Sequence, residues 1–227
     1  MQTPAAGRND FPPRLKRHFA MLCVPTPTPA ALAAMFGPIV RGRFDAAIVG
    51  PDLAALAASA VAATVDVWQR VRSRLLPTPA KPHYAFTLRD VARVVRGLLL
   101  ADRQALVKGG EVVGDAATTA SSSSSLPPSR CLFVGLWAHE CARVFGDRCV
   151  SEADAAWVAA AVVGAAKAHL GGEAAAAATT PPPFFAPFLR DAEPETGEMM
   201  PTSRPCVYEA APGGAPALAA RVRSLLD

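Results

Sequence analysis

The chain has 227 residues, of which 51% are hydrophobic and 7% aromatic, and its formal net charge is +4. This length suffices for one domain with a buried core or for two small subdomains. The mild charge and the lack of aromatics among the basic residues argue against nucleic-acid binding. The N-terminus has no apolar signal core, and the longest uncharged apolar run, Leu53–Val65, falls short of the roughly 20 residues that cross a bilayer. Five cysteines without paired spacing favour an intracellular chain with reduced thiols.

The first elements in chain order are a proline-bounded loop and a short strand, predicted over His18–Val24. Prolines 25, 27 and 29 end this strand and open a helix over about Ala30–Phe44, which Pro38 is expected to kink or divide. A second helix is predicted over about Asp52–Leu76, because apolar residues recur on one face at a spacing of 3.6 residues. The predicted buried face comprises Val61, Val65, Trp68, Val71 and Leu75.

A third helix is predicted to start at Thr87, which forms a capping-box pattern with Asp90. The Ser-rich stretch that follows, residues 109–129, is expected to be a flexible insertion. A fourth helix is predicted over about Arg130–Phe145 and a fifth over Ser151–Leu170. A further helix is predicted at the end, over about Ala215–Leu226. One strand followed by helices predicts a mainly α fold, because the alternating βαβ pattern of a complete nucleotide-binding domain is absent from this sequence.

The sequence lacks the two motifs that an ATPase needs. It contains neither G-x-x-x-x-G-K-[ST] nor an apolar strand that ends in an Asp-Glu pair for Mg²⁺. We therefore expect no ATP hydrolysis by this chain alone. No metal site is predicted either, since His139 and Cys141 are two residues apart on a helix and no second ligand pair follows.

Arginines are the remaining candidates for chemistry. Arg14 and Arg17 precede the predicted strand, where a planar guanidinium group could reach the phosphates of a neighbouring subunit. Arg89 lies in the first turn of the third helix, where backbone N–H groups favour an anion. The alternatives are a solvated basic loop for the first pair and a solvent-facing stripe with Arg93 and Arg96 for Arg89.

Several segments, in this order, resemble axonemal dynein heavy chains of the outer-arm gamma type, in their third AAA+ module. Met1–Asp10 resembles the family's M-Q-T-P-G-G-G-R-N-D, Arg14–Phe19 matches the R-L-K-R-x-F that follows it, and Ile39–Phe44 fits the helix end after that. Leu76–Asp90 resembles L-P-T-P-[AS]-K-x-H-Y-x-F-N-L-R-D and is the most specific match. Leu136–Arg148 resembles L-W-x-H-E-x-x-R-V-x-x-D-R, and Phe188–Gly197 resembles the segment that leads to the next module. The sequence departs from the family at Ala5-Ala6, which replace two glycines, and at Thr87, which replaces asparagine.

The resemblance implies a role for each candidate residue. Arg14 or Arg17 would be the arginine finger that acts on the nucleotide of the preceding module. Arg89 would be the sensor-2 arginine of this module's own site, and Gln2 would lie near the sensor-1 position. The phosphate loop and Mg²⁺ residues would precede Met1, so the chain is expected to be part of a longer heavy chain.

The resemblance also implies a domain organisation and a cellular role. Residues 1–27 would end the large AAA+ subdomain, 28–170 would form the helical lid, 171–183 a linker and 184–227 the approach to the next module. The parent would be an ATP-driven microtubule motor of the ciliary axoneme that binds ATP or ADP with Mg²⁺. Its partners would be the neighbouring AAA+ modules, the microtubule, and dynein intermediate and light chains. Neither nucleic acid nor a membrane is expected as a partner. The alternative is a free-standing helical adaptor that binds a protein partner through an exposed apolar patch.

Overall fold

The computed structural model describes residues 12–22, 24–101, 106, 128–173, 178, 185–186, 209–210 and 214–226. This part is mainly α-helical, as predicted, and includes one pair of antiparallel two-residue strands. The elements are α1 (Pro13–Lys16), α2 (Pro29–Arg43), α3 (Ala46–Val49), α4 (Pro51–Arg74), α5 (Leu88–Leu100), α7 (Pro128–Cys141), a π-helical turn (Ala142–Gly146), α8 (Glu152–His169), β1 (Phe185–Ala186), β2 (Glu209–Ala210) and α10 (Gly214–Leu226).

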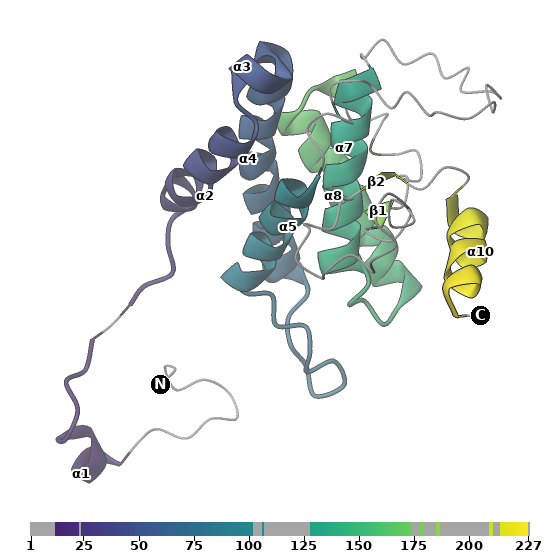
Figure 1. The fold of residues 1–227 in the computed structure, drawn as a ribbon. Helices are drawn as coiled ribbons and strands as arrows, with labels where there is room; N and C mark the ends of the chain where they lie inside the picture. Colours follow the sequence, from purple (N-terminus) through teal and green to yellow (C-terminus); the bar gives the residue numbers. More distant parts are fainter. Residues whose placement is uncertain are drawn as a thin grey trace.

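Helix α4 is the centre of the bundle. It contacts α2, α3, α5, α7 and α8, and these helices surround it in Figure 1. The predicted apolar face of α4 is buried along its whole length. Trp137 of α7 is fully buried beside it and donates a hydrogen bond from Nε1 to Oγ1 of Thr64, at 2.9 Å. Phe133 of α7 meets the ring of Phe44 edge-on, with 5.4 Å between ring centroids.

Helix α4 also has the length and composition of a membrane-spanning helix. However, 56% of its most apolar window is buried inside the bundle. Burial against other helices accounts for its apolar composition, because the core helix of a water-soluble bundle has the same character.

Local sequence signals explain where the helices begin. The Thr28 side chain accepts a hydrogen bond from the Ala31 amide before α2, and Ser151 does the same for the Asp154 amide before α8. Gly50 separates α3 from α4 with a φ of 86°, a conformation that side chains rarely adopt. The five predicted helices and the C-terminal one are confirmed to within a few residues, and α2 continues through Pro38 rather than being divided there.

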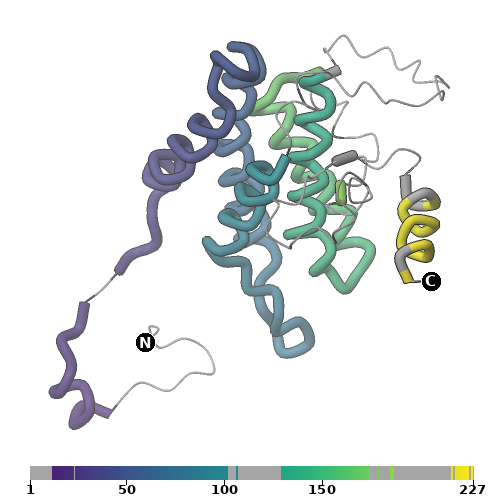
Figure 2. The backbone as a smooth tube through the Cα atoms, in the orientation of Figure 1, coloured from purple at the N-terminus to yellow at the C-terminus, as the bar shows by residue number. Residues whose placement is uncertain are grey.

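The predicted strand over His18–Val24 is wrong. Residues 18–22 and 24 form no strand, and a short helix, α1, precedes them instead. A strand needs a neighbour to take up its backbone hydrogen bonds, and within the described ranges no strand lies beside this segment. Figure 2 shows α1 on an extended arm that leads away from the bundle. The predicted insertion, residues 109–129, lies outside the described residues except for its last two, which already belong to α7.

Candidate functional site

Arg89 lies at an exposed helix N-terminus whose start is fixed by the sequence. Thr87 is extended and caps α5, and its backbone amide donates to Oδ2 of Asp90, at 2.7 Å. This capping box places Arg89 in the first turn, next to backbone N–H groups that have no carbonyl partner within the helix. The Arg89 side chain is exposed to solvent. An anion that approached this end of α5 would meet both the guanidinium group and the positive end of the helix dipole.

The first turn of α5 is also tied to a distant part of the chain by Asp90. The Asp90 carboxylate is buried, and Nη2 of Arg148 donates to its Oδ1 at 2.7 Å. The Arg148 guanidinium group also lies 5.2 Å from the ring centre of Phe86 and donates to the carbonyl of Ala85, at 3.3 Å. Arg93 contacts the same carboxylate at 3.3 Å. The orientation of α5, and with it Arg89, therefore depends on the corner between the π-helical turn and α8.

The loop between α4 and α5 is held against the start of α8. Tyr84 is buried, and its hydroxyl donates to Asp154 at 2.9 Å while accepting from the Val150 amide at 3.0 Å. Lys81 forms an ion pair with the same carboxylate. The Lys81 ammonium group, with the hydrogen bonds from Ser151 and Tyr84, lowers the pKa of Asp154 to about 2.

Acid is therefore expected to loosen this loop. A depressed pKa in the folded state means that the carboxylate stabilises the fold above its unfolded value of about 3.9, and that this contribution is lost as the pH falls towards 2. Urea unfolding of the chain between pH 5 and pH 2 measures the loss. Asp154→Asn is expected to be less stable at pH 5 and to show a flatter pH dependence in this window. An unchanged slope would exclude Asp154 as the titrating group.

A second buried carboxylate joins α7 to α5. Glu140 has no exposed surface, and Oε2 accepts from Nη2 of Arg143 at 2.6 Å. A Cβ atom placed on Gly97 would overlap the Glu140 carboxyl group, so the absence of a side chain at Gly97 makes room for it. The Glu140 carboxylate is thus enclosed between α5 and α7, and Arg143 is paired with it.

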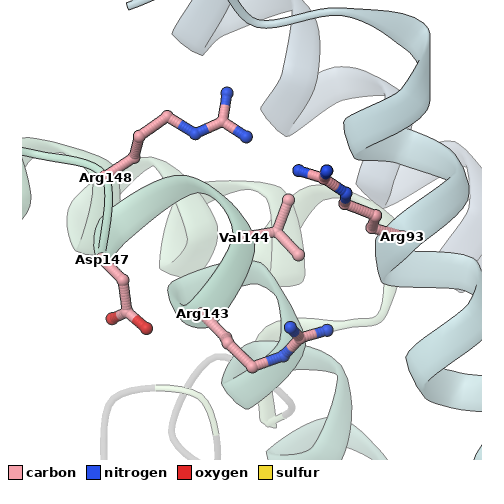
Figure 3. A pocket seen from close by; sticks show the side chains of 5 residues that line it. All are labelled: Arg93, Arg143, Val144, Asp147 and Arg148. Atoms are coloured by element: carbon pink, nitrogen blue, oxygen red, sulfur yellow. The ribbon is translucent and has the colours of Figure 1, made fainter. Parts of the chain in front are cut away.

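Three arginines line one pocket on the surface next to these carboxylates. The pocket has a volume of about 310 Å³ and is lined by Arg93, Arg143, Val144, Asp147 and Arg148. Figure 3 shows the guanidinium groups of Arg93 and Arg148 on the two sides of Val144, with Arg143 below it. The Asp147 carboxylate is directed away from all three guanidinium groups in that view. We call this the three-arginine pocket.

The other predicted site residues lie elsewhere. Arg14 belongs to α1 and Arg17 caps it, and both are exposed on the arm that Figure 1 shows well away from α5. Nε of Arg17 lies 3.3 Å from Nε2 of His18. Gln2 lies outside the described residues. The structure therefore does not bring Arg14 or Arg17 close to Arg89. The roles predicted for these arginines concern two different nucleotide sites, so they require no contact with Arg89.

Burial shifts the pKa of two side chains on α7, Cys141 and His139. Cys141 is buried, and burial raises the pKa of its thiol well above the usual value, so the group stays protonated and is a poor nucleophile. Burial lowers the pKa of His139. Within the described ranges, no three His, Cys, Asp or Glu side chains are grouped so that they could hold a metal ion.

Comparison with known proteins gives one consistent result. Residues 44–155 match the protein family described as dynein heavy chain, ATPase lid domain. The chain is 38% identical over 229 residues to the dynein gamma chain of the flagellar outer arm of Chlamydomonas reinhardtii. This match covers 99% of this chain and 5% of that relative. It is 32% identical to dynein axonemal heavy chain 5 of Mus musculus over 86% of this chain, and 32% identical to dynein axonemal heavy chain 8 of Homo sapiens over 92%. It spans 4% of the length of each of these two relatives.

Proposed function

Because the chain belongs to the dynein heavy chain family and carries its ATPase lid domain at residues 44–155, we propose that it senses nucleotide within an axonemal motor. In this proposal the helical lid, residues 28–170, closes over the nucleotide of its own AAA+ module and relays the movement around the ring. Residues 1–27 end the large subdomain, 171–183 link the lid to the tail, and 184–227 lead to the next module. The motor works in the ciliary axoneme, on microtubules, with dynein intermediate and light chains.

Arg89 is the residue that carries this proposal. It is exposed at the start of α5, where a helix N-terminus already favours an anion, and the ion pair of Asp90 with Arg148 ties this first turn to the corner before α8. A guanidinium group at such a site contacts phosphate oxygens through two parallel hydrogen bonds. Arg89 would thus report whether the γ-phosphate of ATP is present in the module's own Mg²⁺–nucleotide site.

Two further assignments extend the proposal to the arm and to the residues that precede it in the sequence. Arg14 or Arg17 would act as the arginine finger towards the preceding module, since both are exposed and lie on a segment that stands away from the bundle. Gln2 would lie near the sensor-1 position. Because the sequence has no phosphate loop, hydrolysis in the motor would depend on other parts of the heavy chain.

Exposed apolar residues on the arm and on α2 support assembly with other AAA+ elements. Leu22 and Val24 of the arm are 89% and 88% exposed, and Met35 and Ile39 of α2 are about half exposed. Apolar side chains that extend along one segment in this way mark a surface that another protein element covers. In the motor, neighbouring modules would cover it.

The test is Arg89→Ala in the heavy chain that contains this lid, with Arg96→Ala as the control. Arg96 is exposed two turns further along α5, so its removal costs the same charge away from the helix start. We expect Arg89→Ala to weaken ATP binding at this module about tenfold, because a charge-assisted pair of hydrogen bonds is lost. Arg96→Ala should leave the affinity within about twofold. Equal affinities of the two variants for a fluorescent ATP analogue would refute the sensor role.

A further inference from the structure

The three-arginine pocket is separate from the helix start that holds Arg89, although the two share helix α5. Arg93 lies one turn beyond Arg89, and the other two arginines come from the π-helical turn and the corner that follows it. Two distant parts of the sequence therefore build one charged hollow. Arg89 is not among the residues that line it.

Two of the pocket's arginines share one carboxylate. Arg93 and Arg148 both pair with Asp90, which is buried beneath them, so these two guanidinium groups carry one more positive charge than the carboxylate between them. The acid that lines the pocket, Asp147, directs its carboxylate away from the arginines (Figure 3).

The guanidinium groups are already placed before any ligand arrives. Arg148 is only 24% exposed and is fixed by Asp90, the Ala85 carbonyl and the Phe86 ring. Arg93 keeps 52% of its side-chain surface open to solvent, so its further N–H groups can turn to a ligand. A site organised in advance loses little side-chain entropy on binding.

We propose that the three-arginine pocket binds a phosphate-class oxyanion. Planar guanidinium forks match the paired oxygens of a phosphate group, and all three basic residues are arginine rather than lysine. A volume of about 310 Å³ admits a diphosphate, which is larger than one carboxylate group. The phosphate can come from a free polyphosphate or from a phosphorylated side chain of a protein.

Titration calorimetry of the 227-residue chain with inorganic pyrophosphate at low ionic strength tests the proposal. We expect saturable binding that Arg93→Gln weakens about tenfold, because one charge-assisted contact is lost. Arg93 is half exposed, and Asp90 keeps Arg148, so this variant is expected to fold. Arg96→Gln is the matched control, because Arg96 is exposed on the same helix and does not line the pocket, and it should change the affinity less than about twofold.

A second variant gives the opposite result and does not depend on the removal of an arginine. Asp147→Asn removes an exposed negative charge from the rim and is expected to tighten pyrophosphate binding two- to threefold, as surface charge contacts do. Loss of binding in Arg93→Gln with a gain in Asp147→Asn supports the proposal. The absence of saturable binding, or an equal loss in Arg96→Gln and Arg93→Gln, overturns it.

Two peptides identify the source of the phosphate. A short phosphoserine peptide that competes with pyrophosphate supports a modified protein as the natural ligand. Competition by ATP but not by this peptide supports a free polyphosphate. The same peptide with glutamate in place of phosphoserine is the control. If the glutamate peptide binds as tightly as pyrophosphate and depends equally on Arg93, the pocket is a carboxylate-docking surface and the phosphate proposal is wrong.

Discussion

Gly97→Ala is expected to lower the free energy of unfolding of this chain by about 3 kcal/mol. This is the cost expected when an added methyl group overfills a packed core and disrupts a buried ion pair. A Cβ at position 97 would occupy the space of the Glu140 carboxyl group, which has no exposed surface. The carboxylate has to move away from Arg143, or α5 and α7 have to separate. Urea unfolding followed by circular dichroism measures the change.

Two controls isolate the overlap from the general effect of a helical glycine. Gly42 lies in α2 with nothing near the position of an added Cβ, so Gly42→Ala should change stability by less than about 1 kcal/mol. Glu140→Ala removes the group that the new methyl would meet. The double variant Gly97→Ala/Glu140→Ala should therefore be more stable than the sum of the single effects predicts, by at least about 1 kcal/mol. Strict additivity would show that the two positions do not compete for space.

The second large effect is expected at Arg148. Arg148→Ala leaves the buried Asp90 carboxylate with one charged partner, the half-exposed Arg93, and removes the contact with the Ala85 carbonyl. Breaking a buried pair from one side destabilises a fold by roughly 3 kcal/mol or more. Hydrogen exchange of the α5 amides should accelerate in this variant, because the corner no longer holds the first turn.

The exposed pair between Arg70 and Asp66 on α4 is the matched control. Its atoms lie 2.7 Å apart, as in the Arg148–Asp90 pair, but the Arg70 side chain is 44% exposed. Arg70→Ala should cost less than about 1 kcal/mol, since solvent screens a surface pair. Similar losses in Arg70→Ala and Arg148→Ala would mean that burial of Asp90 adds nothing to the strength of its pair.

The helices could be predicted from the sequence because their signals are local. The capping box of Thr87 and Asp90, the period of apolar residues in α4 and the serine before α8 each lie within a few residues of the feature that they determine. The same kind of signal placed Arg89 in the first turn of α5. These parts of the fold and of the candidate site needed no knowledge of tertiary contacts.

The ion-pair partners could not be predicted in this way, because they join segments far apart in the chain. Charged residues such as Glu140 and Arg148 are typical of a solvent-facing helix surface, but Glu140 is buried and Arg148 pairs with Asp90, 58 residues away. A weak signal for Glu140 existed, since it follows Phe133 and Trp137 at helical spacing on the buried face of α7. The predicted strand is wrong for a related reason. A strand depends on a neighbouring strand from elsewhere in the chain, and within the described residues none lies beside this segment.

The structure of the intact heavy chain that carries this lid, determined by electron cryomicroscopy with an ATP analogue in the same module, tests the central claim most directly. Nucleotide sensing by the lid predicts that the Arg89 guanidinium nitrogens lie within about 3 Å of a phosphate oxygen, the distance of a charge-assisted hydrogen bond. It also predicts that the Arg148–Asp90 pair stays closed. An Arg89 side chain that points to solvent while the nucleotide is bound and the lid is closed would contradict the account.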